Sequence, residues 1–246
     1  DGKRGVKTKV EPTLQEAPGV YNDTILAGLD YLLMEMGKRK MLAVLYLNNS
    51  WEWSGGYGYY LEQAGMGKAP RPNEDGYPAF MNFVAKYASC EKAHQLFHDY
   101  VKFILTRTNR YTKKKYKDDP AIMSWQIGNE PRAFSKEQLP AFEKWLGEAS
   151  KLIRSLDKNH LISIGSEGKW GCEGELNCWE RICADKNVDY CNIHLWPYNW
   201  SWVRKDHLLE DLQISCQNTK EYIDEHLEVC GRIRKPLVME EFGYPR

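Results

Sequence analysis

The chain has 246 residues, a formal net charge of zero and 42% hydrophobic residues, which suits one globular domain with a large core. A neutral charge balance argues against nucleic acid as the main partner, because phosphate binding needs a basic surface. No apolar stretch approaches the roughly 20 residues that a membrane helix needs, so we expect no membrane span.

Short apolar runs alternate along the chain with amphipathic runs. The apolar runs predict strands at 41–48, 121–128, 160–165, 188–194 and 236–242. Apolar residues at helical spacing predict helices at 22–38, 89–107, 135–156 and, in one piece or two, 206–232. The predicted strands are apolar on both faces, which is typical of parallel strands covered by helices. Strands and helices in alternation indicate a parallel α/β sheet or barrel.

The remaining segments give less regular signals. Ser135 and Gln138 predict a capping box at the start of the helix at 135–156. The polar residues 1–19 and the long segment 51–88 are interpreted as loops. A (β/α)8 barrel needs eight strand–helix units in about 250 residues. Since five strands are recognisable, either strands have been missed or residues 1–246 are a single barrel domain that is incomplete in this chain.

Two of the predicted strands end in glutamate. Glu130 follows the strand at 121–128, and Glu241 closes the strand at 236–242. Because parallel barrel strands end at the same mouth, we expect both carboxylates there. Two carboxylates across one cleft are the minimal equipment for cleaving a glycosidic bond. A surface or capping role is the alternative for either glutamate taken alone.

Aromatic residues are numerous and clustered in two segments. Aromatic rings in Gly- and Pro-rich loops indicate a surface for flat amphipathic ligands, because Trp and Tyr stack on the apolar faces of sugars and keep a polar edge. Loops that fold back on the core are the alternative. The clusters consist of Trp51, Trp53, Tyr57, Tyr59 and Tyr60, and of Trp196, Tyr198, Trp200 and Trp202.

The chemistry of metals and disulfides is weakly represented. Seven cysteines form no CxxC pair, so no zinc site is indicated. Cys172 and Cys178 share a Gly-rich loop, where a disulfide and buried apolar thiols are both open interpretations. His94 and His98 have the spacing of helical metal ligands but lack the glutamate of a zinc-protease motif, and we interpret them as ordinary helix histidines.

Five sequence blocks in chain order resemble those of one known family. The blocks are PGVYN at 18–22, WEWSGG at 51–56, DDP with WQIGNEPR within 118–132, IHLWPYNW at 193–200 and EEFG at 240–243. The chain resembles the endo-β-1,4-mannanases of glycoside hydrolase family 5, in subfamily 7 with its animal and Bacteroidetes-type branch. The resemblance implies a (β/α)8 barrel that hydrolyses β-1,4-mannosidic bonds in mannan, glucomannan or galactomannan, endo-acting and with retention, without a cofactor or metal.

The resemblance also implies roles for single residues. Glu130 would be the general acid/base and Glu241 the nucleophile, with their carboxyls only ~5–5.5 Å apart. Glu240 would point away from the site, since side chains alternate along a strand. Asn129 would bind the sugar 2-hydroxyl and Arg132 the leaving-group side. The other substrate-binding residues would be Trp51, His194, Trp196 and Trp200.

Three departures from the family pattern affect this interpretation. The family's Asn-Asn-Trp reads Asn49-Ser50-Trp51 here, which alters one polar contact, and Trp196 stands where many members have Tyr. The second-strand Arg and eighth-strand Trp of the family have no counterpart, so we expect a barrel that lacks its first two strands and its last.

Other functions stay open on the sequence. The alternatives are another β-glycanase of the same clan, such as a β-1,4-glucanase or exo-β-mannosidase, and an inactive fragment or sugar-binding protein. The expected partner is a β-mannan polysaccharide or oligosaccharide. The protein is expected to be a monomer that is secreted, periplasmic or held at the cell surface.

Overall fold

The computed structural model describes residues 11–244. Its parallel strands are β3 (Ala43–Tyr46), β4 (Ile122–Gln126), β5 (Leu161–Ser163), β6 (Cys191–Leu195) and β7 (Leu237–Phe242). All five predicted strands are therefore confirmed, with shifted ends. Of the predicted loop at 1–19, residues 1–10 lie outside the described part, and the rest contains an unpredicted antiparallel ribbon of β1 (Gln15–Ala17) and β2 (Val20–Tyr21).

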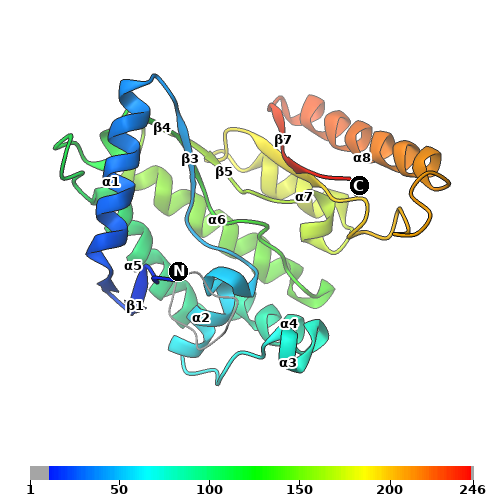
Figure 1. The fold of residues 1–246 in the computed structure, drawn as a ribbon, viewed down its shortest axis with the longest axis horizontal. Coiled ribbons are helices and arrows are strands. Elements are labelled where there is room, and N and C mark those ends of the chain that lie inside the picture. The colour runs from blue at the N-terminus through cyan, green and yellow to red at the C-terminus, as the bar shows by residue number, and fades with distance from the viewer. Residues whose placement is uncertain (1–10, 245–246) are drawn as a thin grey trace.

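The parallel strands follow one another in chain order. β3, β4 and β5 form one sheet, and β6 and β7 form a second. The two sheets are neighbours, because Asp189 N, just before β6, donates to Ile162 O of β5 at 2.8 Å. Helices lie outside the strands (Figure 1). This is the arrangement of a (β/α)8 barrel, of which residues 11–244 supply five parallel strands.

Four predicted helices are present as α1 (Asp23–Lys38), α5 (Glu91–Thr106), α6 (Leu139–Leu156) and α8 (Leu212–Ile233), the last in one piece. α7 (Leu176–Ala184) was not predicted. α5, α6, α7 and α8 each contact the next, as the outer helices of a barrel do (Figure 1).

The segment at 51–88 is not a loop as predicted. It folds into α2 (Gly56–Gln63), α3 (Pro72–Asp75) and α4 (Tyr77–Val84), with 3₁₀ turns η1 (Glu52–Ser54) and η2 (Ala85–Ser89). Its apolar side chains pack into the core, and Phe80 and Val84 are fully buried. Tertiary burial thus outweighs the weak helical signal of a glycine-rich sequence.

Polar side chains play different parts at the starts of α1 and α6. Asn22 caps α1, since its Oδ1 accepts from Thr24 N and Ile25 N at 3.0 and 3.2 Å. The capping box at Ser135 is wrong. The 3₁₀ turn η4 (Lys136–Gln138) comes first, α6 begins only at Leu139, and the Ser135 hydroxyl donates to the Glu137 carboxylate instead.

A buried ion cluster that the sequence did not predict joins α1 to the segment after α5. Asp30 is fully buried and accepts from Arg107 at 2.7 and 3.1 Å and from the Tyr116 hydroxyl at 2.6 Å. Burial alone would raise the pKa of Asp30, but the hydrogen bonds from Arg107 and Tyr116 outweigh it and lower the pKa. The cluster fixes α1 against the barrel wall.

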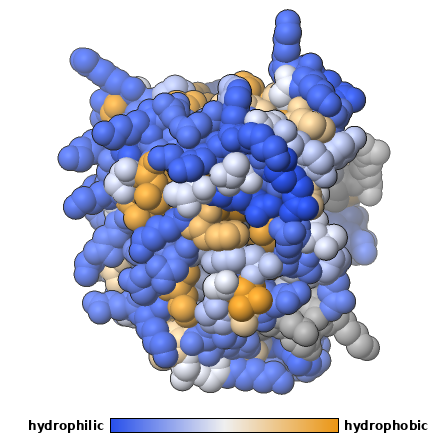
Figure 2. Space-filling view, turned by 90° about the vertical axis from the view of Figure 1, so that its left-hand side faces the viewer, coloured by the Kyte–Doolittle hydropathy of each residue, from blue (hydrophilic) through white to orange (hydrophobic). Residues whose placement is uncertain are grey.

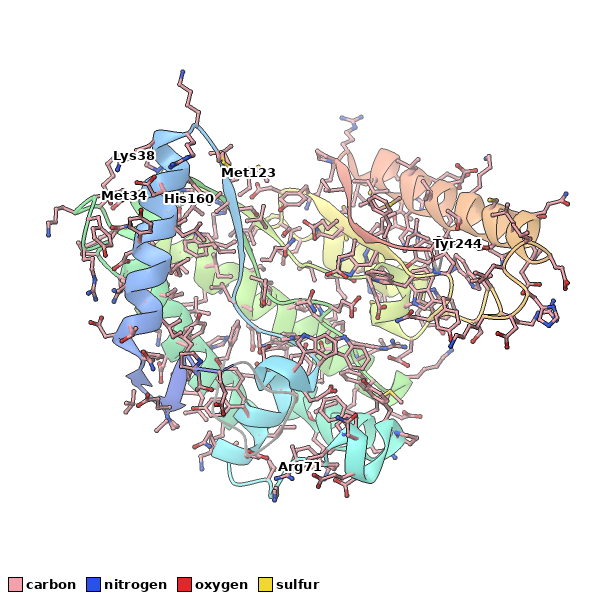
Figure 3. The ribbon with its side chains drawn as sticks, viewed as in Figure 1. Met34, Lys38, Arg71, Met123, His160 and Tyr244 are labelled. Carbon is pink, nitrogen blue, oxygen red and sulfur yellow. The ribbon has the colours of Figure 1, made fainter. Side chains whose placement is uncertain are left out.

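The sequence predicted strands that are covered on both faces, but not all of the strands are. β6 is buried along its length, whereas Tyr46 of β3 and Val238 of β7 are 52% and 40% exposed. These side chains line a cavity of about 620 Å³ on the inner side of the strands, together with Met123. Met123 lies near the start of β4 (Figure 3). Glu240 and Glu241 lie in the same lining.

The outer surface gives no sign of a membrane segment in the described part of the chain, since none of its helices is long and apolar enough to cross a bilayer. One side of the molecule is shown in Figure 2. It is mostly hydrophilic, with hydrophobic residues scattered among polar ones.

Candidate active site

Glu130 is held in an unusual backbone conformation beyond the end of β4. Its φ of 47° is left-handed, which costs a residue with a side chain about 1–3 kcal/mol. Glu130 N donates to Gly165 O at 2.9 Å, and Ser50 Oγ donates to Glu130 O at 2.5 Å. A Cβ on Gly165 would lie 2.0 Å from Gly128 O, so only glycine allows the segments that follow β4 and β5 to come this close. These backbone contacts thus fix the orientation of the Glu130 carboxylate.

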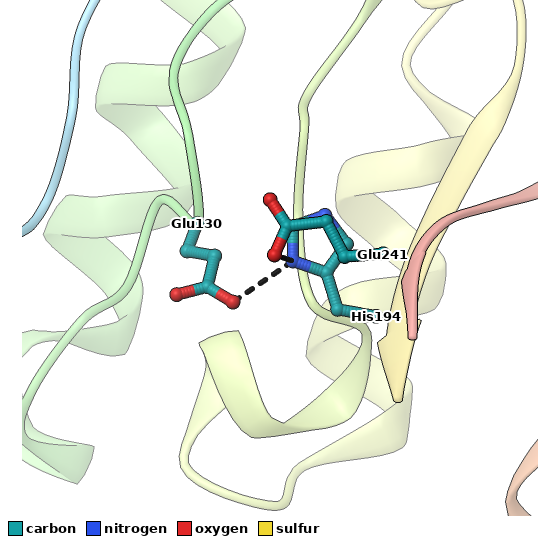
Figure 4. Close-up of side chains that lie close together, drawn as sticks. All are labelled: Glu130, His194 and Glu241. Atoms are coloured by element: carbon teal, nitrogen blue, oxygen red, sulfur yellow. Dashed lines mark hydrogen bonds and ion pairs between the residues drawn. The ribbon is translucent and has the colours of Figure 1, made fainter. Parts of the chain in front are cut away.

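Glu130 and Glu241 meet around one histidine. His194, in β6, places Nδ1 2.8 Å from Glu130 Oε1 and 3.4 Å from Glu241 Oε2 (Figure 4). One oxygen from each glutamate and one ring nitrogen lie within 4.8 Å of one another. Burial opposes charge on the ring, but the Glu130 hydrogen bond and the charges of Glu241 and Glu130 outweigh it and raise the pKa of His194.

Two indole rings donate to the two carboxylates. Trp51 Nε1 donates to Glu130 Oε2 at 2.6 Å, and Trp196 Nε1 donates to Glu241 Oε2 at 3.2 Å. The Trp196 ring lies on Gly243, where a Cβ would come within 2.3 Å of it. Each carboxylate therefore has its own neutral donor, positioned by a neighbouring loop.

Glu240 does not point away from the site, contrary to the prediction from strand alternation. Ile193 pairs with Met239 and His194 with Glu241, so Glu240 is an extra residue in a β-bulge. Its carboxylate accepts from Gln126 Nε2 at 2.5 and 2.6 Å and lies 4.0 Å from His194 Nε2. Burial raises its pKa. The bulge thus turns two consecutive glutamates toward the same histidine.

A further carboxylate, which the sequence analysis missed, lies behind the pair. Glu167 follows β5 and is 3% exposed. Burial, and then the negative charge of Glu130, raise its pKa to about 7. Arg132 donates to Glu167 at 3.2 Å and to Glu173 at 3.2 Å. The rule that found Glu130, a carboxylate just past a buried strand, would also have found Glu167.

The chain is similar to known proteins. Residues 1–246 match the family described as "GH family 5 beta-mannosidase-like".

The chain belongs to glycoside hydrolase family 5.

Curated relatives carry mannanase names. "Mannan endo-1,4-beta-mannosidase 4" of Solanum lycopersicum is 32% identical, over 94% of this chain and 56% of the relative. "Mannan endo-1,4-beta-mannosidase 1" of Arabidopsis thaliana is 31% identical, over 94% and 55%. The family 5 chain thus spans about half the length of the curated relatives it matches.

Solved structures share the fold. A family 5 mannosidase from Rhizomucor miehei superposes with a TM-score of 0.86 at 32% identity, over 97% of this chain and 56% of that one. An endo-beta-1,4-mannanase from Thermotoga petrophila gives 0.77 at 25% identity, over 94% and 50%. The predicted α/β class and (β/α)8 barrel are therefore confirmed as the fold to which this chain belongs.

The departures of this family 5 chain now have a structural description. Ser50, in place of the family's Asn, donates its hydroxyl to the Glu130 backbone. Asn49 keeps a polar role, because Asn129 Nδ2 donates to its Oδ1 at 3.3 Å. Trp196, in place of Tyr, reaches Glu241 through its ring N–H, the one donor that an indole offers.

The aromatic clusters divide between core and site. Tyr57, Tyr59 and Tyr60 are at most 2% exposed and belong to the core, so the prediction of a ligand surface is wrong for these three. Trp51 and Trp196 lie at the carboxylates. Trp200 packs instead in an aromatic group with Trp170, Trp202 and Tyr222, at ring distances of 5.0–6.1 Å, and its contact with substrate stays a prediction.

One group in the described part of the chain has the composition of a metal site. Among residues 11–244, Glu130, His194 and Glu241 are the only set of three His, Cys, Asp or Glu side chains close enough to share an ion. They also bond to one another directly, so that the same atoms fit a proton-transfer site.

Proposed function

We propose that this chain is the catalytic part of an endo-acting enzyme that hydrolyses β-1,4-mannosidic bonds in mannan, glucomannan or galactomannan with retention. The observation that carries the proposal is that Glu130 and Glu241 meet at His194 Nδ1, with one oxygen of each carboxylate within 4.8 Å of the other. Retaining pairs stand roughly 5–5.5 Å apart, whereas inverting pairs need roughly 6.5–9.5 Å to admit a water molecule. The mannanase names of the curated relatives support the choice of substrate.

In the first step, Glu241 attacks the anomeric carbon while Glu130 protonates the leaving oxygen. Negative charge grows on Glu130 as its proton leaves. The Trp51 N–H, 2.6 Å away, strengthens its hydrogen bond to this charge in the transition state. Trp196 and His194 orient Glu241 for attack from the opposite side of the sugar.

In the second step, water displaces Glu241 from the covalent glycosyl-enzyme. Glu130 now acts as base and takes a proton from that water. His194 Nδ1 lies 2.8 Å from Glu130 and 3.4 Å from Glu241. The ring therefore keeps the two carboxylates in the same relative position through both steps. The raised pKa of His194 favours the ring as a donor to both.

The substrate-binding roles extend from this centre. Asn129, beside Glu130, binds the sugar 2-hydroxyl, and Trp51 and Trp196 flank the cleaved bond. Arg132 lies on the leaving-group side, held by Glu167 and Glu173. Trp200 contributes to a more distant sugar position.

A second candidate function is exo-acting β-mannosidase activity. The similarity to the Rhizomucor miehei mannosidase, with a TM-score of 0.86 at 32% identity, favours it. Endo and exo action share the two carboxylates and differ in how far the cleft extends. An inactive or purely sugar-binding protein is the remaining alternative.

The proposal has finer parts. We place the chain in subfamily 7, in its animal and Bacteroidetes-type branch, on the five sequence blocks. Five parallel strands and the exposed inner side chains of β3 and β7 support further barrel strands outside this chain, two before it and one after it. The protein acts as a monomer that is secreted, periplasmic or at the cell surface, where polymeric mannan is accessible.

The test uses the gene product that contains this chain, with mannohexaose as substrate. Glu241→Ala should abolish turnover, and azide should rescue Glu130→Ala on an activated glycoside and yield a β-glycosyl azide. Glu228→Ala, on the exposed side of α8, is the control and should leave activity unchanged. Near-normal turnover by Glu241→Ala would refute the assignment. Early release of mixed oligosaccharides supports endo action, and release of mannose alone supports the exo alternative.

A further inference from the structure

Five of the seven cysteines lie close to another cysteine, in one pair and one group of three. All seven are free thiols in the structure. Cys172 and Cys178 are hydrogen-bonded to each other, and Cys191 contacts both Cys183 and Cys230. These five are buried, so each contact lies in the protein interior.

We propose that Cys172 and Cys178 form a disulfide when the chain folds in an oxidising compartment. Cys172 is the last residue of the 3₁₀ turn η5 (Lys169–Cys172), and Cys178 lies in the first turn of α7. Only 1% and 2% of the two residues is exposed, so the bond forms during folding and is then shielded from reductants.

The two thiols have complementary roles in the reaction. The hydrogen bond from Cys172 and the charge of Arg181 outweigh the burial of Cys178 and the nearby Glu143 carboxylate, so the pKa of Cys178 is lowered and its thiolate is favoured. The Cys178 thiolate attacks a low-molecular-weight disulfide such as oxidised glutathione and expels one thiolate. Cys172 then loses its proton, attacks the Cys178 sulfur and expels the second. The two electrons lost by the cysteines are gained by the glutathione disulfide.

The group around Cys191 lacks such a pairing. Cys191, in β6, has one thiol neighbour in α7 and another in α8, so neither is favoured as its partner. The hydrogen bond to Cys183 raises the pKa of Cys191, and the one to Cys191 raises the pKa of Cys230. Since the thiolate is the reactive form, Cys191 and Cys230 stay reduced.

The bond would tie down a segment that supports the catalytic side of the barrel. Ala133 N, three residues past Glu130, donates to Gly171 O at 3.1 Å. Glu173, next to Cys172, accepts from Arg132 at 3.2 Å. A disulfide in this segment stabilises the backbone immediately behind the proposed acid/base.

The decisive experiment is a peptide map of the gene product, refolded in a glutathione redox buffer and alkylated before digestion. Trypsin should release peptide 170–181, which contains both cysteines. We expect this peptide unalkylated and lighter by two hydrogen atoms than its reduced form. A second digestion at Glu173 and Glu175 should cut its backbone and leave the two pieces joined. Alkylation of both cysteines, or a bond from either to another cysteine, would overturn the proposal.

A stability measurement adds an independent readout. Protein that is reduced while unfolded and then refolded should have a Tm about 5 °C below that of the oxidised protein. The shift is this small because the disulfide closes only a short loop. The difference should vanish in Cys178→Ser and persist in Cys216→Ser, which removes an exposed thiol. Equal shifts in both variants would count against the bond. If Cys178→Ser fails to fold, the map of the unsubstituted protein still decides, and neither test depends on hydrolytic activity.

Discussion

The hydrogen bond from Trp51 to Glu130 can be tested by replacing one atom group. Trp51→Phe removes the ring N–H and keeps an aromatic ring that can stack on Trp53, 5.8 Å away, and meet Phe134 edge to face. A hydrogen bond to a charged group contributes about 1.5–3 kcal/mol. At about 1.4 kcal/mol for each factor of ten, kcat/KM on mannohexaose should fall by about 10- to 150-fold.

The choice of substrate distinguishes this bond from mere ring packing. A dinitrophenyl β-mannoside needs no proton on its leaving group, so little charge develops on Glu130 in the first step. On that substrate Trp51→Phe should lose less than about threefold in kcat/KM. Trp53→Phe is the matched control, because Trp53 is 40% exposed and stacks on Trp51. Equal losses on both substrates would refute the hydrogen-bond argument.

Three further predictions concern stability and site geometry. The folded state keeps the Glu167 proton up to about pH 7, whereas an ordinary glutamate releases its proton near pH 4.5. The free energy of unfolding measured in urea should therefore fall as the pH rises from 4.5 to 7. Glu167→Gln should make this fall smaller. Asp30→Asn should cost about 3–5 kcal/mol in urea unfolding, because Asp30 is fully buried. Asp23→Asn removes a 72% exposed partner of Arg110 and should leave the urea midpoint nearly unchanged; similar costs for both variants would contradict the burial argument. Gly243→Ala should displace the Trp196 ring and lower kcat on mannohexaose with little change in Tm, and an unchanged kcat would show that this ring contact is dispensable.

Strands were predictable from the sequence because each is an apolar run bounded by polar residues. β4 and β6 are buried almost throughout and gave clear signals. The helices of 51–88 were missed, since Gly56 and Gly76 interrupt the pattern and buried tyrosines resemble loop aromatics. α7 was missed because it has only nine residues, so its amphipathic pattern is too short to stand out from the loops on either side.

The carboxylate pair was predictable for a different reason. Parallel strands bring their ends together, so Glu130 and Glu241 could be placed at one mouth without knowing any contact. The position of Glu240 was not predictable, because a β-bulge depends on how two strands pair. The Arg132–Glu167 contact joins segments 35 residues apart and is visible only once β4 and β5 lie side by side.

The bulge at Glu240 also matters for comparing this chain with its relatives. The bulge inserts one extra residue into β7 directly before Glu241. From this point on, counting alternate residues along the strand no longer tells which face of the sheet a side chain is on. A relative without the extra residue would present the same glutamate from an unbroken strand, in phase with the residues before it. Alignments anchored on the upstream part of β7 would then assign the wrong glutamate, whereas alignments anchored on Phe242 and Gly243 would keep Glu241 in its place.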